Sequence, residues 1–234
     1  MDERHTECAC YFLLLLGERI VFELFDPKGD VRKSAGTNLP HWYQSGVTYF
    51  VTFRTEDSIP PEVSRRWYAE RSRWLQVRGI TVIGADWKEQ FAELPKDQQI
   101  QFHETFSRQF LENLDKGWGE CALRRSELSK VVADSLLYFD ADRYHIGDFV
   151  VMPNHVHLLV CLIGDTDIVS QCYSWKKFAA GKINKVLGKV GRFWQEDSFD
   201  HLVRSPEQFA TIQRYIAMNP RNLPNGHYHL RLLK

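Results

Sequence analysis

Cysteine is scarce and irregularly spaced in this chain of 234 residues. The five cysteines are an odd number, no two of them form a C-x-x-C pair, and they stand at positions 8, 10, 121, 161 and 172. A disulfide framework requires paired cysteines and a four-thiolate zinc site requires paired spacings, so this pattern argues against both. We therefore expect reduced, mostly buried thiols.

Long hydrophobic runs are also missing. The longest apolar run is Cys8–Leu16, and the uncharged stretch from Phe149 to Ile163 is interrupted by a proline, an asparagine and two histidines. Both are too short to span a bilayer, which takes about 20 consecutive apolar residues. The residues before Cys8 carry three acids and one arginine, the reverse of the basic start of a signal peptide. The sequence therefore predicts a cytoplasmic protein with no membrane partner.

The common cofactor and hydrolase motifs are absent as well. The chain has no Walker loop, no dinucleotide-binding fingerprint and no nucleophile elbow, so no nucleotide cofactor is expected. It also has no internal repeat and no low-complexity stretch, and its glycines and prolines are scattered rather than clustered. With 44% hydrophobic and 26% charged residues the chain can bury a core, which favours one domain of ordinary size.

The formal net charge is zero, but the charge is unevenly distributed. Residues 171–234 hold eleven lysines and arginines against four acids, whereas residues 1–170 hold 19 basic and 26 acidic residues. A basic terminal quarter is either a solvated helical surface or a surface for an anionic partner such as nucleic acid. Charge alone leaves both open.

The apolar pattern predicts an α+β fold. Residues 47–53 are β-branched and aromatic throughout, which is typical of a strand. Helices and strands then follow in the order helix, strand, strand, helix, helix; we place them at 126–139, 148–152, 155–163, 167–187 and from the Ser205-Pro206 cap to the stop at Pro220. That order is typical of a ferredoxin-like sandwich with an antiparallel sheet.

Residues from about 58 to 118 are expected to form a largely helical insertion after the first core strand. Its helices are predicted at 61–76 and 98–114. Ile80–Ile83 is β-branched but only four residues long, so a short strand is left open there. Before the first core strand, Gly17–Phe25 fits a strand followed by a turn.

Two histidines provide the first candidate for chemistry. His155 and His157 are two apart on a predicted strand, so both side chains point to the same face and both imidazoles can reach one metal ion. Two partly exposed histidines without a metal are the alternative. A metal site would need at least one further ligand from elsewhere.

Two residues of the last helix provide the second candidate. Tyr215 and Asn219 are four apart and therefore lie on one face of the helix. A tyrosine beside an apolar stripe is commonly a core residue. A phenol is, however, a covalent nucleophile in some enzymes, and an amide oxygen is a ligand for hard cations.

Aromatic and basic residues alternate in the basic quarter, at Trp175–Lys177 and at Gly191–Gln195, with Asp200-His201 following. Single-stranded nucleic acid binds such surfaces, because bases stack on rings while lysine and arginine neutralise phosphates. Burial of the aromatic rings in the core is the alternative.

These features occur within five ordered segments: Leu39–Trp42, Tyr49–Arg54, Val151–Leu159, Phe193–His201 and Arg214–Pro220. Val151–Leu159 resembles the histidine-hydrophobic-histidine (HUH) signature of the single-tyrosine transposases. Arg214–Pro220 is similar to the tyrosine motif of the REP-associated branch of that family, and the other three segments resemble the same branch. The resemblance covers residues 39–223, which we expect to be one transposase domain, with 1–38 an unassigned extension and 224–234 a tail.

The resemblance implies the HUH nuclease fold and a metal-dependent endonuclease and strand transferase acting on single-stranded DNA. Tyr215 would be the nucleophile and would form a 5′-phosphotyrosine link, leaving a free 3′-hydroxyl. His155, His157 and Asn219 would hold Mg²⁺ or Mn²⁺.

The resemblance also implies hairpin DNA, of the kind formed by repetitive extragenic palindromes (REP), as the partner. We expect the DNA contacts to come from basic, aromatic and polar residues, namely Arg54, Trp175, Lys176, Lys177, Lys182, Lys185, Arg192, Gln195, His201 and Arg204.

Two other functions remain open. A catalytically retired protein would bind repeat hairpins without cutting them. A metal-dependent hydrolase would activate water at the histidine pair, although the motifs supply no carboxylate for it. Monomer and homodimer are equally compatible with the sequence.

Overall fold

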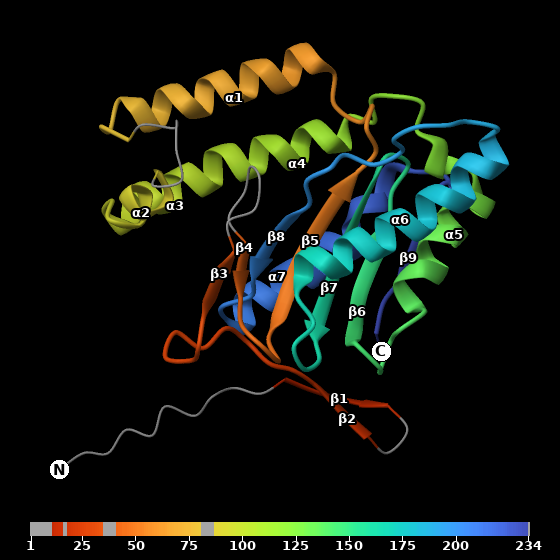
Figure 1. The fold of residues 1–234 in the computed structure, drawn as a ribbon, viewed down its shortest axis with the longest axis horizontal. Helices are drawn as coiled ribbons and strands as arrows, with labels where there is room; N and C mark the ends of the chain where they lie inside the picture. The colour runs from red at the N-terminus through yellow and green to blue at the C-terminus, as the bar shows by residue number, and fades with distance from the viewer. Residues whose placement is uncertain (1–10, 16–17, 35–40, 81–86, 234) are drawn as a thin grey trace.

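The core of the computed structural model is a five-stranded antiparallel sheet (Figure 1). The structure describes residues 11–15, 18–34, 41–80 and 87–233. Along the sheet the strands follow the order β8 (Phe199–Leu202), β5 (Thr48–Arg54), β7 (His155–Leu162), β6 (Tyr144–Val151) and β9 (His229–Arg231). The first four have the order of a ferredoxin-like sandwich, as the sequence predicts, and β9 extends the sheet beside β6.

Helices cover both faces of this sheet. On one face α5 (Ser126–Leu137) and α6 (Ile168–Leu187) pack with the apolar side chains of alternate strand positions, including Val156 and Leu158 of β7. On the other face α7 (Pro206–Met218) packs on the remaining positions, including Leu159. Figure 1 shows α6 crossing the near side of the sheet and α7 behind it.

Strand β6 begins four residues before its predicted start at position 148. Gly147 and Asp148 are residue types that strands usually avoid, and they lie at a shift of register between Ile146 and Phe149. A Cβ on Gly147 would come within 2.9 Å of the Leu159 Cβ, so the close approach of the two strands requires glycine. Strands β8 and β9 were not predicted, because both are short.

Local capping explains the helix that carries Tyr215. The Ser205 Oγ accepts a hydrogen bond from the Gln208 N–H, and Pro206 occupies the first helical position. Helix α7 ends at Met218, and a 3₁₀ turn, Asn219–Asn222, follows because Pro220 cannot continue the helix. Asn219 keeps helical dihedral angles, so it remains on the face of Tyr215.

The predicted helical insertion lies between β5 and α5. It contains α1 (Pro61–Gln76), α2 (Trp87–Ala92), α3 (Lys96–Phe102), a π-helical turn (His103–Ser107) and α4 (Arg108–Asp115). The single helix predicted at 98–114 is thus interrupted by the π-helical turn. A separate apolar cluster, centred on Leu75, Phe102 and Phe106, holds these helices together. Of the strand left open at positions 80–83, Ile80 is not in a strand and the rest lies outside the described residues.

The remaining elements are short. β1 (Tyr11–Leu15) pairs with β2 (Glu18–Phe22), and β3 (Arg32–Ser34) pairs with β4 (His41–Tyr43). A 3₁₀ turn, Ala122–Arg124, precedes α5. Strand β2 falls within the predicted strand 17–25, whose first residue lies outside the described residues.

Three cysteines lie in the described part of the chain, at positions 121, 161 and 172, and all are buried free thiols as expected. Positions 8 and 10 lie outside the described residues. Among the described helices, none has the length and apolarity needed to cross a membrane.

Candidate active site

His155 and His157 lie side by side on the face of the sheet that α7 covers. Alternation along β7 points both side chains this way, and they are 1% and 0% exposed. Burial lowers the pKa of His155 to about 3 and lowers the pKa of His157 well below its ordinary value, the neighbouring His155 adding to the effect on His157. Both imidazoles are therefore neutral at pH 7 and able to bind a cation through a lone pair.

Hydrogen bonds fix the orientation of both rings. The Asn154 Nδ2 donates to the Trp118 carbonyl at 3.1 Å, so its Oδ1 accepts from the His155 Nδ1 at 2.7 Å. The His157 Nδ1 lies 2.7 Å from the Thr52 Oγ1. With the proton of each ring assigned to Nδ1, both Nε2 atoms present lone pairs to the same space, as in metal sites where a second hydrogen bond orients each ligand.

Asp115 joins the two histidines, and sequence reasoning missed it. A ligand atom of Asp115, one of His155 and one of His157 all lie within 4.8 Å of one another. The Asp115 Oδ1 is 3.7 Å from the His155 Nε2. Burial raises the pKa of this carboxyl, although its side chain is 43% exposed and forms the solvent side of the cluster.

The position of Asp115 follows from the turn after α4. Asn154, which orients His155, also donates to the carbonyls of Leu114 and Trp118 and so ties this turn to the start of β7. At the other end of the insertion, the Asp57 carboxylate accepts from the Glu120 N–H at 2.7 Å. These contacts bridge sequence separations of 36 to 63 residues, so no local pattern indicates them.

Asn219 completes the group. Its Nδ2 donates to the Asp115 Oδ1 at 3.2 Å, while its Oδ1 is buried and has no hydrogen-bond partner. The His155 Nε2 is buried without a hydrogen-bond partner as well. Two such acceptors beside a carboxylate are costly without a cation, so the set of imidazole nitrogens, carboxylate and amide oxygen fits a divalent metal ion.

Tyr215 brings a phenol hydroxyl to this group. Its hydroxyl lies 3.1 Å from the His157 Nε2, and its ring meets those of His157 and Phe50 at centroid distances of 5.0 Å and 6.2 Å. Burial, with a smaller contribution from Asp115, raises the pKa of Tyr215 far above its ordinary value. The phenol is therefore protonated at pH 7 and needs activation before it can attack.

Two of the residues predicted to contact DNA are structural instead. Trp175 is 2% exposed, packs in the core and donates from its Nε1 to the Tyr144 Oη at 2.9 Å, so it offers no surface for a base. Lys176 is 8% exposed and donates from its Nζ to the carbonyls of Gln195 and Glu196. The predicted DNA contacts of Trp175 and Lys176 are corrected accordingly: both side chains face the core.

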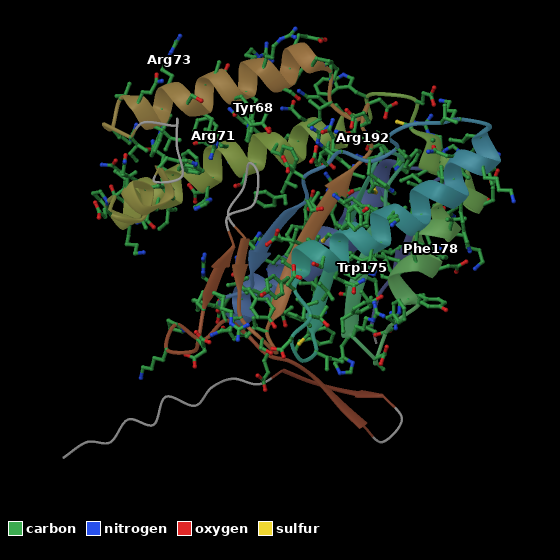
Figure 2. The ribbon with its side chains drawn as sticks, in the orientation of Figure 1. Tyr68, Arg71, Arg73, Trp175, Phe178 and Arg192 are labelled. Carbon is green, nitrogen blue, oxygen red and sulfur yellow. The ribbon has the colours of Figure 1, made fainter. Side chains whose placement is uncertain are left out.

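Four of the predicted DNA contacts are exposed basic residues on or just after α6, on the opposite face of the sheet from the histidine pair; they are Lys177, Lys182, Lys185 and Arg192. The side chains of Lys177 and Lys182 lie over the exposed rings of Tyr173 and Phe178. Figure 2 labels Phe178 and Arg192 on this side. The structure thus separates these residues from the site but keeps basic and aromatic groups together on one surface.

The other predicted DNA contacts lie elsewhere. Arg54 is opposite His155 in the β5–β7 ladder, and its Nη1 donates to the Ser58 Oγ. His201 contacts the Phe50 ring on the site face, and burial lowers its pKa to about 4. Gln195 donates to the Glu56 carbonyl, while Arg204 is exposed above the Phe25 ring. Arg54 and His201 are therefore closer to the candidate site than the basic residues of α6.

The comparisons with known proteins found similarity among solved structures only. No family model and no curated protein matches the chain. A solved structure of a REP-associated tyrosine transposase bound to a REP hairpin matches with a TM-score of 0.42 and 17% sequence identity, over 80% of this chain and 73% of that chain. Because similarity at this level carries no argument for function, the function is argued below from the geometry of the site.

Proposed function

We propose that this chain is a metal-dependent enzyme that nicks and rejoins single-stranded or hairpin DNA through a covalent link to Tyr215. The observation that carries the proposal is the 3.1 Å contact between the Tyr215 hydroxyl and the His157 Nε2, because a phenol beside groups that could bind a cation supports the role of a nucleophile. Mg²⁺ or Mn²⁺ held by His155, His157, Asp115 and Asn219 would polarise a phosphoryl group and offset the charge that develops on it.

Tyr215 is the residue that forms and breaks the covalent bond. Its Oη attacks phosphorus in line, the bond from phosphorus to the 3′ oxygen breaks, and the phenol proton passes to that oxygen directly or through solvent. The 5′-phosphate stays on Tyr215 and the strand ends in a 3′-hydroxyl. Because the link retains the phosphodiester energy, another 3′-hydroxyl can reverse the step and join strands without ATP.

The remaining site residues position the nucleophile and its neighbours. Thr52 and Asn154 hold the imidazoles in one orientation, and the 3₁₀ turn after α7 keeps Asn219 next to Tyr215. Asp115 leaves one side of the cluster exposed, which gives a strand access to the tyrosine. Arg54 lies nearby on the site face and is the basic residue we assign to the phosphate backbone there.

The surface of α6 is proposed to contact the more distant part of the hairpin. Lys177, Lys182 and Lys185 are exposed there, with the exposed rings of Tyr173 and Phe178 between them. Such a surface binds DNA through its phosphates and stacks on unpaired bases without reading their sequence.

A metal-dependent hydrolase is the second candidate, and Asp115 favours it. The carboxylate that such an enzyme needs as a base is absent from the sequence motifs, yet the structure brings Asp115 to the histidine pair. In that enzyme water rather than Tyr215 would attack, so no protein–DNA adduct would form.

The test is an adduct assay. The purified protein is incubated with labelled single-stranded hairpin oligonucleotides, with Mg²⁺ or Mn²⁺ present or chelated, and run on a denaturing protein gel beside Tyr215→Phe. Tyr138→Phe, which alters an exposed tyrosine just after α5, is the matched control. We expect a metal-dependent adduct that Tyr215→Phe abolishes and Tyr138→Phe preserves. Cleavage without an adduct would support the hydrolase, and binding without cleavage would support a retired DNA-binding protein.

A further inference from the structure

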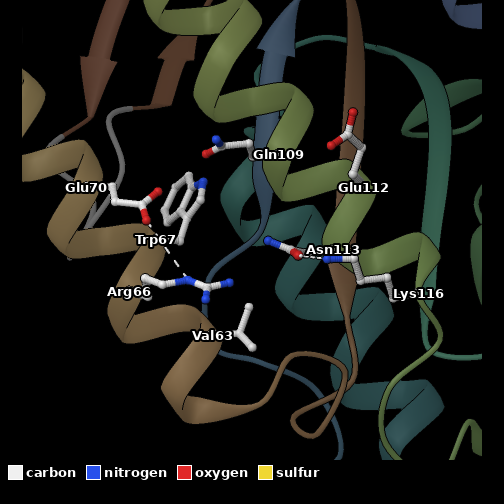
Figure 3. A pocket seen from close by; sticks show the side chains of 8 residues that line it. All are labelled: Val63, Arg66, Trp67, Glu70, Gln109, Glu112, Asn113 and Lys116. Atoms are coloured by element: carbon white, nitrogen blue, oxygen red, sulfur yellow. Dashed lines mark hydrogen bonds and ion pairs between the residues drawn. The ribbon is translucent and has the colours of Figure 1, made fainter.

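The helical insertion contains a pocket that the proposed reaction does not use. It has a volume of about 270 Å³ and lies between α1 and α4 (Figure 3). This is below the ~300–1,000 Å³ of pockets for drug-sized molecules, and it suits a fragment such as one nucleobase. We propose that the pocket receives one unstacked base of the DNA strand that Tyr215 cleaves, an inference that rests on the proposed function.

The lining offers a stacking surface and an unsatisfied acceptor. Trp67 of α1 points into the pocket, and its Nε1 already donates to the Phe106 carbonyl at 3.2 Å, so what it offers is its aromatic surface. Gln109 of α4 also lines the pocket, and its Oε1 is buried without a hydrogen-bond partner. A base that stacks on the indole and donates an amino N–H to this oxygen satisfies both groups.

The charges around the pocket favour a neutral ligand over a phosphate. Its two carboxylates are both ion-paired: Glu70 with Arg66 at 4.0 Å, and Glu112 with Arg108 at 3.7 Å. The Lys116 Nζ donates to the Asn113 Oδ1 at 3.0 Å. The lining holds two basic and two acidic side chains, Arg66 and Lys116 against Glu70 and Glu112, so its formal charges cancel and a phosphate gains little net attraction there, which favours an uncharged heterocycle.

The amide of Gln109 narrows the choice of base. An oxygen that needs a donor is satisfied by the exocyclic amino group of adenine, cytosine or guanine, and a glutamine side chain can pair with adenine through both of its polar atoms. Thymine offers only its ring N3–H as a donor and no amino group. We therefore expect an amino-bearing base, adenine first, at the position that enters the pocket.

The pocket is also close to the candidate active site along the chain. Gln109 precedes Asp115 by six residues of α4, which is about 9 Å along a helix axis, or about two to three nucleotides of stacked DNA. A smaller cavity shares Val63, Trp67 and Asn113 with this pocket and reaches Arg54. Arg54 is opposite His155 in the β5–β7 ladder, so this cavity extends from the pocket toward the strand that carries His155, and we assign the DNA strand to this direction.

The experiment is an abasic scan of the substrate. Hairpin oligonucleotides carry an abasic nucleotide at each single-stranded position in turn, and their Kd is measured by fluorescence anisotropy with Mn²⁺ on the Tyr215→Phe protein, which prevents cleavage. We expect one position at which removing the base weakens binding by about five- to 100-fold, the range of base–aromatic stacking. At that position adenine should bind better than thymine.

Variants of the pocket residues then test whether the base at that position is the one that enters the pocket. Adding Gln109→Leu should remove the preference for adenine over thymine, and adding Trp67→Leu should remove most of the abasic effect, whereas Gln101→Leu, which alters an exposed glutamine of α3, should leave both unchanged. Circular dichroism checks that the variants fold. If Trp67→Leu does not fold, the effect of Gln109→Leu on the preference for adenine decides whether the pocket holds the base.

The outcomes separate this inference from the proposed function. If the wild-type chain forms the Tyr215 adduct but Gln109→Leu and Trp67→Leu leave the base dependence unchanged at every position, the pocket holds no base and only this inference is overturned. If oligonucleotides bind without an adduct, the tyrosine mechanism fails, while the abasic scan still decides on the pocket. If no oligonucleotide binds, both fail.

Discussion

The Tyr215 hydroxyl lies 3.1 Å from the His157 Nε2, so the nucleophile occupies the lone pair through which His157 would bind a cation. The other ring nitrogen, Nδ1, is 2.7 Å from the Thr52 Oγ1, and the imidazole is thereby held on both sides. A cation bound at Nε2 would replace this contact, so in the proposed enzyme binding of the cation and release of the Tyr215 hydroxyl would be coupled.

This coupling predicts the effect of Tyr215→Phe on metal binding. The variant lacks a hydrogen bond that competes with the cation and is worth about 0.5–1.5 kcal/mol. Mn²⁺ should therefore bind the variant as tightly as the wild type, or up to about tenfold more tightly, while the covalent adduct disappears. Isothermal titration with Mn²⁺ measures this, and a clear loss of affinity would mean that Tyr215 itself is a ligand.

Asp115→Asn tests the ligand that sequence reasoning missed. The amide keeps a hydrogen-bonding oxygen but removes the one carboxylate that, among the described residues, groups with both histidines. We expect the Kd for Mn²⁺ to rise at least about tenfold, because even residues that only orient ligands change affinity by about 10- to 100-fold. Asp134→Asn, at an exposed carboxylate paired with Lys130 on α5, is the control. Equal affinities for both variants would remove Asp115 from the site.

Charge reversal on α6 tests the proposed DNA surface. Changing Lys177, Lys182 and Lys185 to glutamate should weaken binding of hairpin DNA and reduce the slope of log K against log salt, by about 0.7–0.9 for each phosphate that the variant no longer neutralises. Reversing Lys28, Arg32 and Arg143, three exposed cations outside both α6 and the helical insertion, is the matched control. An unchanged slope in the α6 variant would place the DNA elsewhere.

Lys176→Met tests the structural role of Lys176 by comparison with the adjacent Lys177. Removing the Nζ of this buried lysine leaves the partly buried Gln195 and Glu196 carbonyls without their donor, which costs about 1–3 kcal/mol of the free energy of unfolding. Lys177→Met, at the adjacent exposed lysine, should stay within about 0.5 kcal/mol of the wild type. Urea denaturation measures both. Equal stabilities would show that the carbonyls find other donors.

The sequence predicts those parts of the structure that depend on local pattern. Alternation along β7 sets the shared face of His155 and His157, and the Ser205 cap with the stop at Pro220 sets the helix that carries Tyr215. Asp115 lies beyond such reasoning, because Asn154 brings it to the site from 40 residues away by holding the Leu114 carbonyl. For Trp175 and Lys176 the sequence predicted a contact that the structure does not support. An aromatic and a basic residue in a basic segment indicate DNA binding, yet both side chains are buried.

His201 provides a prediction on pH. Burial, reinforced by the positive charge of Arg204, lowers its pKa to about 4 in the folded chain, whereas an unfolded histidine titrates near 6.5. Between these values the unfolded state binds a proton that the folded state does not, so this histidine lowers stability as the pH falls from about 6.5 to about 4. The contribution is up to about 1.4 kcal/mol per pH unit.

His155 and His157 act in the same direction, so the comparison is made between variants, with a metal chelator present. His201→Asn should therefore lose less stability than the wild type between pH 6.5 and 4.5, as measured by urea denaturation. If His201→Asn has the same slope as the wild type, the imidazole is solvated in the folded protein and the site face around Phe50 is open to water at that point.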